Sequence, residues 1–179
     1  MEYKTKPTGK PSDFYAIGLV VTGAIFWRIT FVQDSLIALY QLLSVIMFGA
    51  AMYLLIRYRL TVFSFRIEGR NGAVVDIRTA MPEELDFVVG KMRGKGAVPL
   101  ARLSLDELKS VKTVSTELLK DKARELSLFK YHPDMSPDEG VLIVFSGGAK
   151  DIGIFSCLSS EMLAFLEKTA SDNLRGVDI

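Results

Sequence analysis

The feature that most constrains this chain is an uncharged apolar run at residues 36–56, LIALYQLLSVIMFGAAMYLLI. An α-helix rises about 1.5 Å per residue, so a helix of this length crosses a bilayer hydrocarbon core of roughly 30 Å. A second apolar stretch, FYAIGLVVTGAIFWRITFV at residues 14–32, precedes it and contains one charge, Arg28. Arg28 lies about one turn from the end of that stretch, so its side chain can extend to the lipid head groups. Trp27 suits the same interface.

Only residues 33–35 separate the two stretches, and a turn this short predicts an antiparallel hairpin whose ends leave the membrane on one side. Basic residues flank the open end of the hairpin: Lys4, Lys6, Lys10, Arg57, Arg59, Arg66 and Arg70. Near the turn between the two stretches, by contrast, the one basic residue, Arg28, is balanced by the acidic Asp34. The positive-inside rule therefore predicts two spans in the inner (cytoplasmic) membrane with both termini cytoplasmic. Arg57 and Arg59 join Trp27 and Arg28 as predicted interface anchors.

A competing interpretation treats residues 1–32 as a cleaved signal peptide. It fits the sequence less well, because no small-x-small cleavage site follows the apolar run. A full second span also comes immediately after it. We therefore expect residues 1–13 to be a cytoplasmic tail, residues 14–57 to be the transmembrane hairpin and residues 58–179 to be a cytoplasmic domain.

Two polar residues, Gln41 and Ser44, lie within the second span. An intramembrane polar residue can mark a transport path, but two helices do not readily enclose a pore. We expect instead interhelical hydrogen bonds beside small residues that allow close packing, namely Gly18, Gly23, Gly49 and Ala50. Gln41, Ser44 and Gly49 are the candidates for intramembrane helix contacts.

The rest of the chain is charge-rich, and its composition narrows the expected partners. The formal net charge of +1 gives no global attraction to nucleic acid, so nucleic acid is not an expected partner. The single cysteine, Cys157, excludes an internal disulfide and fits a reducing compartment. The lone His132 leaves no His/Cys cluster for a metal. We expect no cofactor and no metal.

From about residue 60 the apolar period changes to two, which is typical of half-buried strands. TVFSFRI at residues 61–67 alternates in this way, and Asn71-Gly72 predicts a hairpin turn into a second strand, AVVDIRT. Pro99 weakens a later strand or places it at a sheet edge. Residues 116–126 fit either a short helix or a hairpin arm. The further predicted strands lie near residues 85–92, 98–105, 110–115, 126–131 and 141–145, and at IGIFSCL.

The last predicted element is an amphipathic helix, which Ser159 or Ser160 can cap. Its apolar stripe has helical spacing and consists of Met162, Leu163, Phe165, Leu166 and Ala170. The soluble part is thus an α+β domain of about seven short strands followed by one helix. We expect that helix to pack on the open end of a curved sheet.

This order of elements resembles the pleckstrin-homology-like (PH-like) fold, an antiparallel β-barrel or sandwich closed by a C-terminal helix. The whole arrangement resembles the bacterial membrane proteins with a two-helix hairpin and a PH-like domain. The segments that carry the resemblance are residues 61–79, ARLSLDELKSV at 101–111, VLIVF at 141–145 and IFSCLSSEMLAFLEK at 154–168. The resemblance implies a binding module rather than an enzyme, and it carries over no ligand residue.

The chain contains no P-loop, dinucleotide fingerprint, G-x-S-x-G or H-E-x-x-H motif. We expect His132 to be a solvated loop residue and Cys157 to be a small apolar strand residue. Adjacent carboxylates fall in turn-like stretches and are best explained by solvation: Glu83-Glu84, Asp106-Glu107 and Asp138-Glu139. We therefore expect no catalytic residue.

The basic turn Lys91, Arg93 and Lys95 is the remaining candidate site. In many PH domains a basic hairpin loop binds lipid phosphates, and a tethered domain would hold this turn near an anionic leaflet. The alternative is an ordinary solvated hairpin that resists edge pairing.

We therefore expect a non-enzymatic, membrane-anchored PH-like module that presents a surface to protein, peptide or anionic lipid head groups. An exposed sheet edge would also admit a partner strand. One alternative is a sensor or assembly factor that acts through its transmembrane hairpin, with a protein partner or a homo-oligomer. Another is a membrane enzyme, which would need a cleft with two convergent titratable groups.

Overall fold

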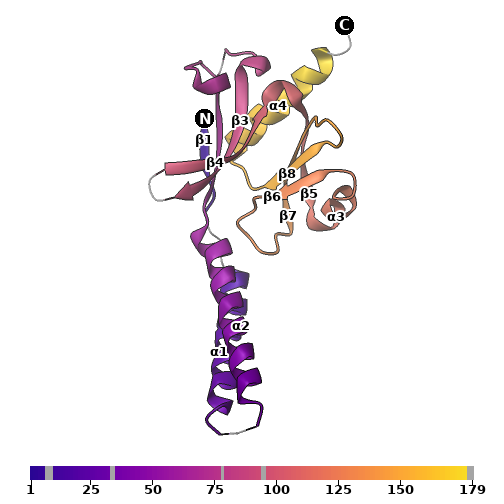
Figure 1. The fold of residues 1–179 in the computed structure, drawn as a ribbon. Coiled ribbons are helices and arrows are strands. Elements are labelled where there is room, and N and C mark those ends of the chain that lie inside the picture. Colours follow the sequence, from indigo (N-terminus) through magenta and orange to yellow (C-terminus); the bar gives the residue numbers. More distant parts are fainter. Residues whose placement is uncertain (7–9, 33–34, 78, 94–95, 177–179) are drawn as a thin grey trace. The chain divides into compact units, whose positions relative to one another are not determined.

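The computed structural model describes residues 1–6, 10–32, 35–77, 79–93 and 96–176. This part of the chain is an α+β protein with four α-helices and two four-stranded sheets. It divides into two compact units (Figure 1). The β unit comprises Met1–Lys6, Val62–Pro133 and Pro137–Ile179, and the hairpin unit comprises Pro7–Thr61 with Asp134–Ser136.

The hairpin unit consists of α1 (Lys10–Ile29) and α2 (Ile37–Leu54), which continues as the π-helical segment η1 (Leu55–Leu60). The segments Pro11–Ile29 and Ile37–Leu60 are long and apolar enough to cross a membrane. Only 17% and 11% of the residues in their apolar windows are buried, whereas a core helix of a soluble protein is mostly buried. Helix α1 begins earlier than the predicted span, and the second helical segment extends past residue 56.

Small residues form the contact between α1 and α2. Ala16, Ser44 and Ala51 are buried there. A Cβ atom on Gly23 would lie 3.3 Å from the Cβ of Met47, so the absence of a side chain at Gly23 allows the two helices to pack closely there. The Ser44 hydroxyl donates a 2.9 Å hydrogen bond to the Gly23 carbonyl. Most large apolar side chains of this unit point outward.

The first sheet of the β unit is antiparallel and has the strand order β1-β2-β3-β4. Its strands are β1 (Glu2–Lys4), β2 (Phe63–Gly69), β3 (Leu85–Arg93) and β4 (Gly96–Ser104). The predicted alternation at residues 61–67 is confirmed, because Phe63, Phe65 and Ile67 face the core. Strand β1 was not predicted from the sequence.

The predicted hairpin at Asn71-Gly72 is wrong. A 3-10 turn, η2 (Arg70–Gly72), follows β2, and the described residues of AVVDIRT form no strand. Both edges of β2 are already occupied, by β1 on one side and β3 on the other, so AVVDIRT finds no free edge there. Val74 is consequently fully exposed.

The second sheet has the strand order β5-β7-β8-β6. Its strands are β5 (Leu108–Ser115), β6 (Ser127–Lys130), β7 (Glu139–Phe145) and β8 (Ile152–Ser156). The apolar run VLIVF lies in a central strand, as predicted, while β6 pairs with β8 in parallel. Residues 116–122 form the helix α3 (Thr116–Lys122), so the helical alternative holds for this segment.

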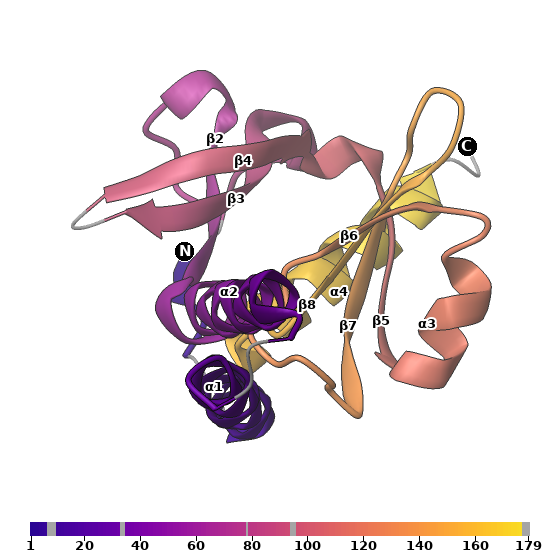
Figure 2. The same ribbon diagram turned by 60° about the horizontal axis from the view of Figure 1, so that its bottom comes forward.

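Helix α4 (Ser160–Gly176) completes the core of the β unit. The Ser159 hydroxyl accepts a hydrogen bond from the Met162 N–H, which confirms the predicted cap. Met162 and Leu166 are fully buried against side chains from both sheets. The core contains a stack of three rings, Phe65, Phe87 and Phe145, with neighbouring centroids 6.1 and 5.9 Å apart. The two sheets remain separate and do not close into a barrel (Figure 2).

Candidate functional site: an apolar cleft between two edge strands

A cleft of about 170 Å³ lies within the β unit. Side chains from β4, from β6 and the residue after it, and from β8 line it: Leu100, Ala101, Leu103, Phe129, Tyr131, Ile152 and Ile154. Leu100 and Phe129 are 47% and 49% exposed, which is high for large apolar side chains in a folded unit. The cleft therefore presents apolar surface that the described part of the chain does not cover.

The two strands that border the cleft are both edge strands. β4 ends the first sheet and β6 ends the second. The Ser127 and Tyr131 N–H groups bond to the Asp151 and Phe155 carbonyls, each at 2.9 Å. Because the backbone N–H and C=O groups of successive residues in a strand point to opposite edges, those of Leu128 point away from β8. An open edge of this kind can accept another extended chain.

A β-bulge directs Leu100 into the cleft. Val89 pairs with Ala101 and Gly90 pairs with Pro99, so Leu100 is an extra residue on β4. A bulge changes the direction in which a side chain points and bends the strand locally. The position of Pro99 on an edge strand confirms the prediction for this proline. A Cβ on Gly90, opposite the bulge, would lie 2.8 Å from the Ser64 hydroxyl oxygen, so a larger residue there would have to displace the Ser64 side chain.

Tyr131 is the single titratable side chain in the described lining of the cleft. Burial raises the pKa of its hydroxyl above the ordinary value. Its ring packs edge-on against Phe63, with centroids 5.4 Å apart. Phe63 in turn pairs with Lys91 across β2 and β3. Lys91 therefore lies next to the end of the cleft that Tyr131 forms.

The basic turn predicted from the sequence is described in part. Lys91 and Arg93 are exposed and lie two residues apart, on the same face of β3 as the core residue Val89. The β3–β4 hairpin pairs as far as Arg93 opposite Gly96. Lys95, the third candidate, lies outside the described residues. The structure thus places Lys91 and Arg93 on one face of β3, with Lys91 paired with Phe63, the residue whose ring packs on Tyr131.

Within the hairpin unit, the candidate contact residues separate into two groups. Ser44 lies at the contact between α1 and α2. Gln41 and Gly49 are exposed on α2 and lie away from α1. Gly18 is also exposed, so Gly23 is the glycine at the close approach.

The predicted anchor residues lie at both ends of the apolar helices. Trp27 and Arg28 are exposed in the last turn of α1. The Arg57 guanidinium lies 5.2 Å from the centre of the Tyr58 ring. Arg59 forms an ion pair with Asp13. Sequence reasoning missed this pair, because nothing in the linear pattern couples positions 46 residues apart.

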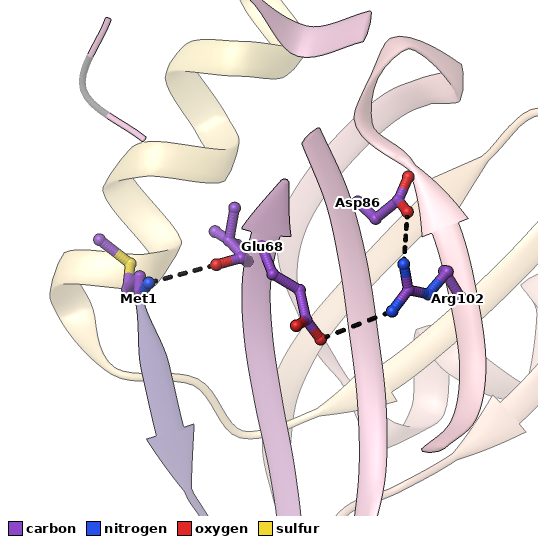
Figure 3. Close-up of polar contacts among 5 residues, drawn as sticks. Met1, Glu68, Asp86 and Arg102 are labelled. Carbon is purple, nitrogen blue, oxygen red and sulfur yellow. Dashed lines mark hydrogen bonds and ion pairs between the residues drawn. The ribbon is translucent and has the colours of Figure 1, made fainter. Parts of the chain in front are cut away.

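Charged residues on the outer face of the first sheet form a small network that the sequence did not indicate (Figure 3). Arg102 on β4 contacts the Asp86 carboxylate at 3.1 Å and the Glu68 carboxylate at 3.8 Å. The Met1 amine donates a 3.2 Å hydrogen bond to the Ile67 carbonyl. Because Asp86 is buried, its charge needs the Arg102 partner. The Arg102 ion pairs thus connect β4, the strand that carries Leu100, to β2 and β3.

The two single residues of chemical interest lie elsewhere. His132 is buried, with its ring stacked on Phe155 at a centroid distance of 5.6 Å, so the expectation of a solvated loop residue is wrong. Cys157 is half-buried, and its sulfur lies 3.9 Å from the Tyr3 hydroxyl. In the described ranges, no group of three or more His, Cys, Asp or Glu side chains is placed to hold a metal.

Comparison of the chain with protein-family models, with curated proteins and with solved structures returned no match. The fold and the cleft define a class in coarse terms: an α+β protein with two apolar helices and an open, apolar cleft.

Proposed function

We propose that this protein is a non-enzymatic interaction module anchored in the inner membrane by α1 and α2. Its β unit faces the cytoplasm and presents a surface to a protein, a peptide or anionic lipid head groups. The observation that carries the proposal is the apolar cleft between β4 and β6, with exposed Leu100 and Phe129 and two open strand edges. Uncovered apolar surface beside open backbone edges favours binding of another chain.

The pairing of β1 with β2 supports the anchoring part of the proposal. Glu2 pairs with Arg66 and Lys4 pairs with Ser64, so both flanks of the helical hairpin belong to one sheet. If the two helices cross a membrane, the sheet requires their open ends to emerge on the same side. The excess of Lys and Arg at those ends supports a cytoplasmic location for that side. Removal of residues 1–32 as a signal peptide would delete β1.

The order of elements supports a PH-like interpretation of the β unit. Seven strands, β2 to β8, follow the hairpin, and α4 packs its apolar stripe into the core behind the last strand. Three features differ from the expected pattern: β1 comes from before the hairpin, β6 is parallel to β8, and the sheets stay open. The open side is where the cleft lies.

The lining of the cleft favours binding over acid–base catalysis. Paired general acid–base chemistry needs two titratable groups within reach of a substrate. Tyr131 alone provides one in the described lining, and burial raises its pKa further from neutrality.

Site-specific crosslinking in intact membranes tests the proposal. A photoreactive phenylalanine analogue would replace Leu100 or Phe129 in the full chain, with the exposed Val74 as the matched control position. We expect a macromolecular adduct from the cleft positions and none from Val74, in a fraction that resists carbonate extraction. No adduct from either cleft position would contradict the interaction function, and extraction by carbonate would contradict the anchor.

The lipid part of the proposal rests on Lys91 and Arg93. Only Thr61 and Val62 connect Leu60 to Phe63, and Phe63 pairs with Lys91. Chain length alone therefore keeps Lys91 within on the order of 15 Å of the end of the apolar helix. Replacing Lys91, Arg93 and Lys95 by Gln should reduce labelling by a photoreactive anionic lipid but not by a neutral one. Equal labelling of both forms would remove lipid from the proposal.

A second function is favoured by the exposure of Gln41 and Gly49 on α2. A polar side chain directed at lipid is costly, and a partner helix would satisfy it. The hairpin would then act as an assembly element for other membrane proteins or for further copies of this chain. Gln41→Leu and Gly49→Leu should weaken co-purification of such a partner while the α1–α2 contact remains. Unchanged partners would exclude this role.

A further inference from the structure

We infer that the cleft accepts an extended peptide as an additional strand on β4, with apolar side chains at alternate positions and acidic residues at the Tyr131 end. This inference rests on the proposed interaction function and names the chemistry of its partner.

The strand edges provide backbone hydrogen bonds for such a peptide. Pro99 on β4 has no N–H to donate, but the part of β4 that follows it, 100–104, is still longer than the four-residue β6, so β4 offers the longer ladder. Backbone bonds supply affinity in strand addition, while pockets for alternate side chains supply selectivity. The apolar floor formed by Ile152 and Ile154 lies beside this edge. A strand added to β4 would direct every second side chain toward that floor.

The size of the cleft matches individual side chains. Pockets that take a whole small molecule are typically about 300–1,000 Å³. The cleft here is about 170 Å³, so it holds one or two apolar side chains of a longer ligand. The bulge places Leu100 in the wall, where it can pack against those side chains. An extended chain that supplies side chains at intervals is therefore favoured over a compact ligand.

The distribution of charge gives the peptide a direction. At the Tyr131 end, Lys91 is paired with Phe63 across the sheet, and Arg93 follows two residues later. At the opposite end, Asp151 precedes Ile152 and is held by Lys109, with Nζ–O distances of 2.8 and 2.9 Å. Asp151 thus neutralises Lys109 at that end, whereas the exposed Lys91 and Arg93 at the Tyr131 end would be complemented by acidic residues of a peptide.

Selection from a random nine-residue peptide library on phage tests the inference. The target is the full chain in nanodiscs of phosphatidylcholine, with empty nanodiscs for subtraction. We expect the selected peptides to alternate apolar and polar residues and to carry Asp or Glu at one end. No enrichment would overturn strand addition, while a crosslink from Leu100 in intact membranes would leave the proposed interaction function standing.

Variants of the chain connect the selected peptides to the cleft. Leu100→Glu should weaken binding of a selected peptide at least tenfold, and Val74→Glu should leave it unchanged. Phe129→Ser is a second cleft variant. Only variants whose circular dichroism spectrum matches that of the wild type are used for the binding measurement. Lys91→Gln with Arg93→Gln should weaken binding by about 2- to 20-fold, because exposed ion pairs contribute modestly. Wild-type affinity in both cleft variants would overturn the inference.

N-methylation of the selected peptide separates strand addition from apolar contact. Two peptides are compared, one methylated on the odd-numbered amides and one on the even-numbered amides. One should lose binding and the other should keep it, because only alternate N–H groups of the peptide point toward β4. Tolerance of both patterns would overturn the inference. If a photoreactive anionic lipid labels the Leu100→Cys chain, and this labelling prevents the peptide from binding, the cleft is a lipid-binding site. A crosslink between two copies through the cleft would assign it to self-association, and either result overturns the peptide.

Discussion

The two units of this protein distribute large and small side chains in opposite ways. In the β unit the aromatic residues Phe65, Phe87 and Phe145 are fully buried. In the hairpin unit the buried positions are Ala16, Ser44 and Ala51, and large apolar side chains are exposed along both helices. The same hydrophobic residue types therefore face inward in one unit and outward in the other.

This difference indicates whether each unit is suited to water or to lipid as its surroundings. In water, burial of apolar area drives folding, so the largest side chains belong in the core. In lipid there is no such gain between helices, and close backbone approach between small residues takes its place. The hairpin unit follows the second rule, which agrees with the proposed membrane anchor.

The largest effect is expected for Phe87→Ala in the β unit. Phe87 is fully buried between the rings of Phe65 and Phe145, and removal of such a side chain costs about 3–5 kcal/mol. Phe14→Ala in the hairpin unit is the matched change at a position 77% exposed, and we expect less than about 0.5 kcal/mol. Denaturant unfolding in detergent, followed by strand circular dichroism, measures both. Similar losses for the two variants would break the contrast.

An intermediate effect is expected for Gly23→Ile. A Cβ at this position already lies 3.3 Å from Met47 and Phe48 atoms, so a larger side chain should force α1 and α2 apart at about 1–3 kcal/mol. Gly18→Ile is the control, since a Cβ there meets nothing within 4 Å. Amide hydrogen exchange of the helices in nanodiscs is the measurement. Equal exchange in the two variants would show that the helices do not pack through Gly23.

A smaller effect is expected for Ser44→Ala. The variant loses the hydrogen bond to the Gly23 carbonyl, and such bonds contribute about 0.6 kcal/mol on average inside membranes. Thr22→Val provides the comparison, because the Thr22 hydroxyl bonds to Gly18 within the same helix. The same exchange experiment should show faster exchange in Ser44→Ala only. A loss as large as that of Gly23→Ile would indicate that the hydroxyl, rather than close packing, holds the helices together.

The smallest effect is a pH dependence in the β unit. Hydrogen bonds from Lys109 and from the Gly147 N–H hold the pKa of Asp151 below its ordinary value. A lowered pKa in the folded state stabilises the fold above the unfolded value of about 3.9, and the contribution disappears as the pH falls through the folded value. The stability advantage of the wild type over Asp151→Asn should therefore be present at pH 7 and shrink in acid. An advantage independent of pH would contradict this assignment.

Local patterns predicted much of the fold. The alternation of Phe63, Phe65 and Ile67, the apolar run of β7 and the capped stripe of α4 were all visible in the sequence and are confirmed. The prediction of a strand at AVVDIRT was wrong, because a segment can pair with β2 only where an edge of β2 is free. β1, contributed from before the hairpin, takes the edge of β2 that the prediction left open.

The cleft was harder to predict from the sequence than the strands were. Its lining comes from β4, β6 and β8, which no motif links along the chain. Pro99 was the only signal, because it correctly indicated an edge strand. The bulge at Leu100 depends on the register between β3 and β4, which is set by three-dimensional pairing. The burial of His132 against Phe155 could not be predicted for the same reason.

The pairing of β1 with β2 has a consequence for biosynthesis. The Met1 amine and the Ile67 carbonyl are separated by 66 positions, and both apolar helices lie in that interval. The ribosome must release the whole hairpin before the first sheet can acquire its edge strand. Forming the antiparallel hairpin brings the ends of this long loop together and lowers the entropic cost of its closure. Formation of the helical hairpin therefore favours completion of the first sheet.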